Sequence, residues 1–296
     1  MTNRRQHTVP QFYLRPFLSP GLVYRRGAKG PYQIKHPGNV AVQRDYYGRE
    51  EPGQVTLDTV NRKMEEDGAP ALRKLIENPC TITVDDWVNL SWLIANLWIR
   101  TPSQIDDMLT SYRQVYSEIR SMVEPIALKV KEGVVDPPSE SSFHKSGNST
   151  RYTVEEIQEI DDYLKVRDAY LLSAEQSFKQ LSAIARGIQE MHFFLVHAPK
   201  GRYFITSDRP FVLRSMLTGS RAGVGLANSD AMASIPLCPT TVLVMMHGES
   251  GCISEAEATA EHVDFLNLQM MSFANQEVYS RFESQETHDW MRGRGR

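Results

Sequence analysis

Four polar side chains from separate parts of the chain have types suited to acid–base chemistry on a phosphate: His7, Glu65, Arg100 and Asp208. A histidine gains or loses a proton near neutral pH, and a carboxylate can orient it or hold a metal ion. The planar guanidinium of an arginine suits a phosphate group. If the four side chains meet in one cleft, we expect phosphodiester cleavage or another transfer on a phosphorylated substrate.

Each of these residues also has an ordinary structural interpretation. His7 could cap a backbone group, Asp208 could accept a hydrogen bond within its own turn, and Arg100 could pair with Glu65. For any one residue the structural role is slightly favoured. Convergence of all four would reverse that judgement.

A second set of residues is expected to contact the substrate. Asn96 lies four residues before Arg100, so the two share one stripe of a helix, and Ser207 directly precedes Asp208. The set consists of Tyr13, Arg15, Arg25, Arg26, Asn96 and Ser207.

Positive charge is concentrated near the beginning of the chain. Residues 1–49 hold nine Lys or Arg residues against one acidic residue, whereas the whole chain has a net charge of −3. Such asymmetry marks a surface for nucleic acid, with RNA favoured over DNA. It is equally well explained by a basic segment that lies against the acidic remainder of the same protein.

The opening segment, residues 7–17, must be positioned by the rest of the chain. Phe12, Tyr13 and Phe17 give it too much aromatic surface to remain in water. We expect the three rings to pack against the helical half of the protein. His7 and Arg15 are then expected to face the turn that contains Asp208.

The hydrophobic periodicity predicts an α+β fold. Helices are expected near 57–76, with an interruption at 68–70, and at 87–98, where apolar residues recur at three- and four-residue steps. Period-two patterns predict hairpins at 22–35 and 192–206, a strand at 241–246 and a closing strand at 277–280; a helix is expected at 254–274. The architecture expected is a helical N-terminal half with a β-hairpin, and a mixed or antiparallel sheet in the C-terminal half.

We expect residues 1–296 to form a single domain, with a mobile loop at 133–152 and a mobile tail at 291–296. The three cysteines are far apart, and no apolar segment follows the basic residues at the start. These features predict a cytoplasmic protein without a membrane partner. No spacing of cysteine and histidine fits a zinc motif, and the residues indicate neither a cofactor nor an oligomeric state.

The opening segment is similar to the hallmark of a widespread, mostly bacterial family of uncharacterised proteins, written His-x-Val-Pro-x-x-Tyr-Leu-Arg-x-Phe. Other motifs follow in the same order. Residues 96–102 resemble the family's Arg-x-Pro helix end, and residues 204–210 resemble its Thr-Ser-Asp-x-Pro turn, although Arg209 replaces a small polar residue. Residues 235–239 resemble its Pro-Leu-x-Pro strand. Glu65 and Asn267 fall in the expected helices. The resemblance implies one intact domain and supplies no reaction.

Three functions agree with these observations, and whether the protein is an enzyme is open. The first is an intracellular nuclease, such as an RNase toxin or a phage-defence effector, because the basic segment accompanies the His/Glu/Arg/Asp set. The second is a non-catalytic module that binds nucleic acid or a protein. The third is an enzyme that acts on a nucleotide or another phosphorylated small molecule.

Overall fold

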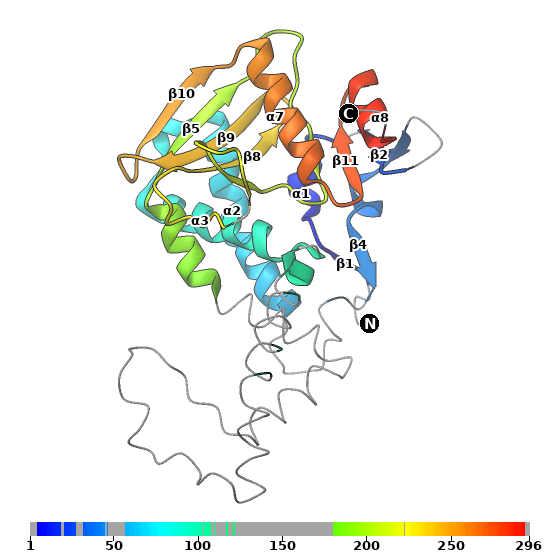
Figure 1. Ribbon diagram of the computed structural model, residues 1–296. Coiled ribbons are helices and arrows are strands. Elements are labelled where there is room, and N and C mark those ends of the chain that lie inside the picture. Colours follow the sequence, from blue (N-terminus) through cyan, green and yellow to red (C-terminus); the bar gives the residue numbers. More distant parts are fainter. Residues whose placement is uncertain are drawn as a thin grey trace, which may run out of the picture. The chain divides into compact units, whose positions relative to one another are not determined.

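The computed structural model describes residues 5–18, 21–27, 32–44, 46, 57–102, 104–107, 110, 117, 121, 180–221 and 223–293. The chain divides into two compact units, one formed by Met1–Gln104 with Glu175–Arg296 and the other by Ile105–Ala174. The elements below belong to the first unit (Figure 1). The loop expected at 133–152 lies outside the described residues.

A mixed five-stranded sheet forms the centre of this unit. Its strands in spatial order are β10 (Ile253–Glu257), β5 (Met191–His197), β9 (Thr241–His247), β8 (Ala231–Cys238) and β7 (Val212–Ser215). Only the β10–β5 pair is parallel. The register between β8 and β9 shifts between Pro236 and Cys238, because a proline has no N–H to give to the ladder.

Alternating residues of this sheet enter two different cores. On β5, Phe193 and Leu195 pack with the helices α2 (Leu57–Glu77) and α3 (Val84–Ile99). Phe194 and Val196 join a second cluster that includes Val263 of the helix α7 (Ala260–Phe273). Successive side chains of a strand point to opposite faces. The central strands are therefore buried on both faces.

A smaller antiparallel sheet joins the two ends of the chain. Its order is β3 (Gln33–Lys35), β2 (Gly21–Arg25), β11 (Glu277–Ser280) and β6 (Thr206–Ser207). The hairpin expected at 22–35 is therefore present as β2 and β3. A separate pair is formed by β1 (Arg5–His7) and β4 (Val42–Arg44).

Helix α1 (Gln11–Leu14) lies within the opening segment, and the single turns η1 (Pro37–Asn39) and η2 (Pro79–Thr81) connect longer elements. Helices α2 (Leu57–Glu77) and α3 (Val84–Ile99) pack together. Lys74 pairs with Asp86 and Glu65 pairs with Arg100, so the two helices run antiparallel. The capping box of Thr83 and Asp86 explains where α3 begins.

The interruption expected at 68–70 does not occur, and α2 continues through Pro70. Pro70 is exposed, so the ring points away from the neighbouring helix. Gly68 is buried against α3, where a Cβ atom would lie 2.6 Å from Cβ of Leu93. The sequence pattern predicted a helix break at Gly68. The glycine is instead required because α3 packs too closely for a larger residue.

The hairpin expected at 192–206 is also wrong. Strand β5 pairs with β9 and β10, whereas Thr206 pairs with β11 in the smaller sheet. Phe204 and Ile205 are both buried, but in different clusters. The chain therefore crosses from one sheet to the other at these two residues.

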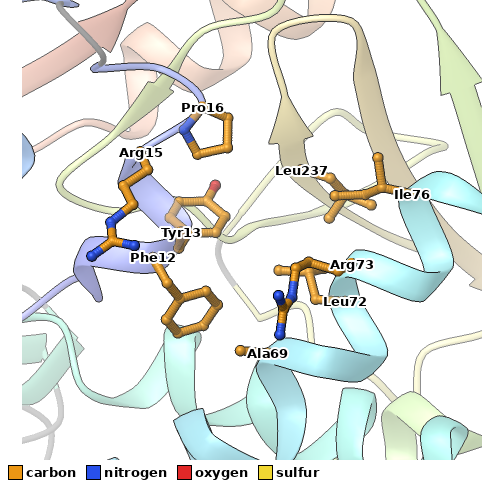
Figure 2. Close-up of a pocket in the computed structure, with 9 residues that line it drawn as sticks. All are labelled: Phe12, Tyr13, Arg15, Pro16, Ala69, Leu72, Arg73, Ile76 and Leu237. Atoms are coloured by element: carbon orange, nitrogen blue, oxygen red, sulfur yellow. The ribbon is translucent and has the colours of Figure 1, made fainter.

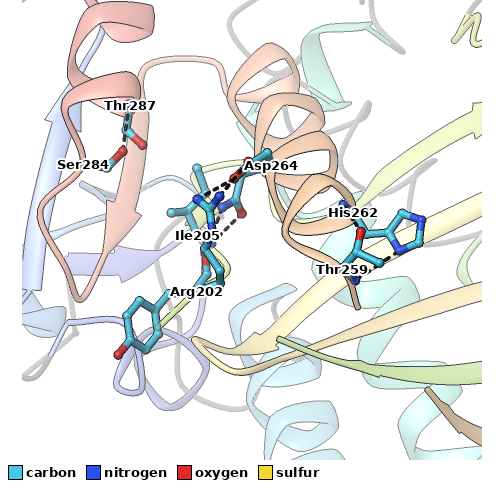
Figure 3. A network of polar contacts seen from close by, with 9 residues as sticks. Arg202, Ile205, Thr259, His262, Asp264, Ser284 and Thr287 are labelled. Carbon is cyan, nitrogen blue, oxygen red and sulfur yellow. Dashed lines mark hydrogen bonds and ion pairs between the residues drawn. The ribbon is translucent and has the colours of Figure 1, made fainter. Parts of the chain in front are cut away.

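Helix α7 (Ala260–Phe273) begins later than expected, after β10, because Thr259 and His262 form a capping box (Figure 3). Arg202 binds Asp264 through two hydrogen bonds of 3.1 and 3.2 Å. Helix α8 (Gln285–Met291) follows β11 and buries Met291, where the tail was expected to begin. The α+β class is confirmed. Among the described residues, no helix is both long enough and apolar enough to cross a membrane.

Candidate functional site

Three of the four residues expected to be catalytic meet at Arg100. This residue caps the C-terminus of α3, and its side chain is only 2% exposed. One guanidinium nitrogen lies 2.5 Å from Oε1 of Glu65 on α2, and the other donates a hydrogen bond to the backbone carbonyl of His7 at the end of β1. A buried guanidinium requires such partners, because losing water is costly for a charge. Arg100 thus joins three elements.

The ring of His7 is partly buried beside this ion pair. Nε2 lies 2.7 Å from the side-chain nitrogen of Gln11. An amide nitrogen can only donate, so in this arrangement Nε2 accepts and the neutral ring carries its proton on Nδ1. Burial and then the charge of Arg100 lower the pKa of His7, against the opposing effect of the Val40 carbonyl. His7 is therefore neutral at pH 7.

Two asparagines complete this group of polar residues. Asn61 lies one turn before Glu65 on α2, and Asn96 lies one turn before Arg100 on α3. Their exposed fractions are 1% and 0%. Within the described part of the chain, neither the nitrogen nor the oxygen of either amide has a hydrogen-bond partner. Each such buried group costs about 1–3 kcal/mol when it is left unpaired, so both amides have hydrogen-bonding capacity left for a ligand or a water molecule.

We refer to His7, Asn61, Glu65, Asn96 and Arg100 as the polar cluster. It combines a neutral imidazole, a carboxylate that is 26% exposed, a buried guanidinium and two unpaired amides. This set can accept a proton at His7 and can exchange hydrogen bonds with a polar ligand through the amides. Asn96, expected to contact substrate, belongs to the cluster.

Asp208 lies outside this cluster and makes structural hydrogen bonds. Its carboxylate accepts three backbone N–H groups, from Asn275 at 2.9 Å, Gln276 at 2.7 Å and Glu277 at 3.0 Å. Burial raises the pKa of the Asp208 carboxyl, and these three donors oppose that shift. Asp208 therefore fixes the turn between α7 and β11. The expected convergence of four catalytic residues is reduced to three.

The Asp208 turn is approached by Tyr13 rather than by His7 or Arg15. The Tyr13 hydroxyl lies 2.8 Å from the hydroxyl of Thr206 and donates to the carbonyl of Pro236 at 2.7 Å. Ser207 is also buried, and its hydroxyl contacts the sulfur of Met270 and accepts from the Arg209 N–H. Tyr13 and Ser207 thus hold the fold together at positions where we expected substrate contacts.

Part of the basic segment is used inside the protein. Arg26 donates to the carbonyls of Met271, Ala274 and Asn275 at the end of α7. Arg5 donates to the carbonyl of Gly38 and to Asn39. Cations near a helix C-terminus are stabilising. Arg25, by contrast, is an exposed residue of β2.

A pocket of about 510 Å³ opens between α1, α2 and β8 (Figure 2). Its walls are mostly apolar, and two exposed arginines lie among them, Arg15 and Arg73. The lining residues are Phe12, Tyr13, Arg15, Pro16, Ala69, Leu72, Arg73, Ile76 and Leu237. Arg15, expected to contact substrate, therefore lies at the edge of this pocket.

Residues 5–284 match the profile of a family described as proteins of unknown function, DUF4238. The chain belongs to the DUF4238 family. No curated protein matches it, and no solved structure does.

In this member of DUF4238, the motifs that carried the resemblance have largely structural contacts. Asn267 accepts from the Ile205 N–H at 3.1 Å and donates to the Tyr203 carbonyl at 2.8 Å, which fastens α7 to the segment before β6. Two residues near the candidate sites were not foreseen, Asn61 and Arg73. Their spacing could have identified them, because residues 61, 65, 69 and 73 follow one another at four-residue steps and so share one face of α2.

Proposed function

We propose that this protein is a nuclease that hydrolyses phosphodiester bonds, with RNA as its substrate and the polar cluster as its catalytic site. The observation that carries the proposal is the pair of buried asparagines with unpaired amides, next to the Glu65–Arg100 ion pair. Unpaired buried amides are costly for folding, whereas a substrate that binds them recovers the lost hydrogen bonds.

In this proposal each member of the cluster has a role. In this step Nε2 of neutral His7 exchanges its hydrogen bond from Gln11 for one from a water molecule. It then accepts a proton as the water oxygen attacks phosphorus, and the proton is returned to the oxygen that leaves. The amides of Asn61 and Asn96 hold the oxygens of the phosphate and sugar. Arg100 keeps Glu65 and the His7 backbone in place through its two contacts, so it acts as a positioning residue.

The test is cleavage of a labelled single-stranded RNA by the purified protein. We expect His7→Gln, which removes the base, and Glu65→Gln, which breaks the ion pair that positions the cluster, each to lower the cleavage rate by about 100-fold or more. Glu66→Gln is the matched control, because Glu66 is the neighbouring residue of α2 and is exposed. Wild-type protein that leaves RNA intact, or variants that cleave at the wild-type rate, would refute the proposal.

A toxin or phage-defence role would follow from such an activity. Expression of the wild-type chain in bacteria is then expected to slow growth, and expression of Glu65→Gln at an equal level is not. Equal growth inhibition by both proteins would contradict this role.

An enzyme that acts on a nucleotide or another phosphorylated small molecule is the second candidate. The pocket between α1 and α2 favours it, because about 510 Å³ is in the range of small-molecule sites. The cleavage assay distinguishes the candidates when mononucleotides replace RNA: hydrolysis of mononucleotides alone would favour the second.

A further inference from the structure

We infer that the pocket between α1 and α2 is a binding site for a nucleoside monophosphate, with Arg15 and Arg73 on the phosphate and the apolar wall on the base. The inference does not depend on the reaction proposed for the polar cluster, since it concerns equilibrium binding alone.

The first support is the state of the two arginines. Both border the pocket, Arg15 from the end of α1 and Arg73 from α2. Within the described residues, neither guanidinium group has a hydrogen-bond or ion-pair partner, unlike those of Arg5, Arg26 and Arg100. Two unpaired guanidinium groups at one cavity form an anion site, because each can donate two parallel hydrogen bonds.

The presence of two arginines favours a phosphate over a carboxylate. One guanidinium fork already satisfies both oxygens of a carboxylate. A phosphate monoester carries nearly two negative charges and three acceptor oxygens, so it can accept hydrogen bonds from both guanidinium groups. In Figure 2 the ring of Phe12 lies between the guanidinium groups of Arg15 and Arg73.

The remaining walls suit a flat, weakly polar body. Leu72 and Ile76 of α2 line the cavity together with Leu237 of β8 (Figure 2). The ring of Phe12 adds an aromatic surface, and stacking of a base on an aromatic side chain tolerates any base. A phosphate at the arginines and a base against these walls together describe a nucleotide.

The pocket also continues the polar cluster along α2. Ala69 lies one turn beyond Glu65, and Arg73 lies one turn further. The rise along the helix from Glu65 to Arg73 is therefore about 12 Å. A nucleotide bound in the pocket would have the polar cluster at one side along the same helix.

Isothermal titration with adenosine 5′-monophosphate tests the inference, with adenosine and hexanoate as probes that lack the phosphate. We expect Arg15→Gln and Arg73→Gln each to weaken binding by about 10-fold or more. Arg186→Gln is the matched control, since Arg186 is an exposed arginine outside the pocket. Melting curves of the variants verify that each remains folded.

The inference is overturned if adenosine monophosphate does not bind, if adenosine or hexanoate binds as tightly, or if the two pocket variants bind like wild type. The titration is repeated in Glu65→Gln. Binding of the nucleotide without RNA cleavage would refute only the nuclease, whereas RNA cleavage without nucleotide binding would refute only this site.

Discussion

Asp208 accepts three consecutive backbone N–H groups with one carboxylate. These N–H groups lie between the end of α7 and the start of β11, where strand pairing does not supply an acceptor for all three. The Asp208 carboxylate supplies it instead. The sequence left two roles open for Asp208, a catalytic carboxylate or a hydrogen-bond acceptor within its own turn. Its actual partners lie 67 to 69 residues away along the chain, a distance that no local pattern reports.

We expect Asp208→Ala to lower the free energy of unfolding by about 2–4 kcal/mol, because three N–H groups lose a charged acceptor. Urea denaturation followed by circular dichroism measures the loss. RNA cleavage by the folded fraction should remain, since Asp208 lies outside the polar cluster. Loss of cleavage with unchanged stability would return Asp208 to the catalytic set.

His7 links stability to pH. Burial and Arg100 lower its pKa in the folded protein, while the unfolded chain keeps the ordinary value near 6.5. Above that value the ring is neutral in both states and its contribution is complete. As the pH falls from about 7 to about 5, the unfolded chain takes up a proton that the folded ring resists, so stability decreases.

Denaturation midpoints at about pH 7 and pH 5 test this linkage. The His7→Gln protein should lose less stability over this range than wild type. An identical pH dependence in the two proteins would show that other groups account for it.

At the scale of elements, the polar cluster depends on how closely α2 approaches α3. Gly68 permits the approach, because a Cβ atom there would lie 2.6 Å from Leu93 Cβ and 3.1 Å from the Asn89 carbonyl. The Glu65–Arg100 pair lies less than one turn along α2 from this point. Helix packing therefore sets the geometry of the ion pair.

We expect Gly68→Ala to destabilise the protein by about 1–3 kcal/mol through overpacking and to lower RNA cleavage by shifting Glu65. Gly187→Ala is the control. Gly187 lies in the helical residues 180–189, and a Cβ there would meet Leu226 at an ordinary 3.4 Å. The better helix propensity of alanine should therefore leave stability equal or slightly higher. Thermal melting measures both changes. Equal melting temperatures for Gly68→Ala and wild type would contradict the packing argument.

The elements predicted correctly are those whose own residues show a regular spacing of apolar side chains. Apolar residues from Trp87 to Trp98 repeat with helical spacing, and α3 covers them. Pro70 was misinterpreted because a proline usually ends a helix, whereas packing sustains α2 on both sides of it. The partner of β5 could not be predicted, since Phe204 and Ile205 have the composition of a strand but belong to different cores.

The sequence named four members of the polar cluster by residue type and spacing. The structure brings Glu65, Arg100 and the backbone of His7 into contact, and Asn96 lies one turn before Arg100 on α3. Asn61 was missed although it precedes Glu65 by one turn, because a lone asparagine carries no chemistry until its burial is known. Burial and pairing of side chains far apart in sequence are tertiary properties.

For the whole molecule, the smaller sheet ties the beginning of the chain to its end. Strand β11 lies between β2 and β6, and Arg26 binds the carbonyls at the end of α7. The basic segment is therefore divided between internal contacts and exposed charge. The net charge of the segment could not show which arginines make internal contacts and which are exposed. Arg25 and Arg26 are adjacent arginines, yet only Arg26 binds the end of α7.

This division yields a prediction for nucleic-acid binding. If the basic segment contacts single-stranded RNA, each arginine on a phosphate contributes about −0.7 to the slope of log K against log salt concentration. We expect Arg25→Gln to make the slope shallower by about that amount and to leave the melting temperature unchanged. Arg26→Gln should instead lower the melting temperature, because three carbonyls at the end of α7 lose their donor, and should leave the slope unchanged. Filter binding at several salt concentrations, together with melting curves, separates the two outcomes.

A slope that responds equally to both substitutions would mean that Arg26 leaves α7 to bind RNA. A slope that responds to neither would exclude both arginines from the RNA-binding surface, in which case the basic segment balances the acidic remainder of the protein.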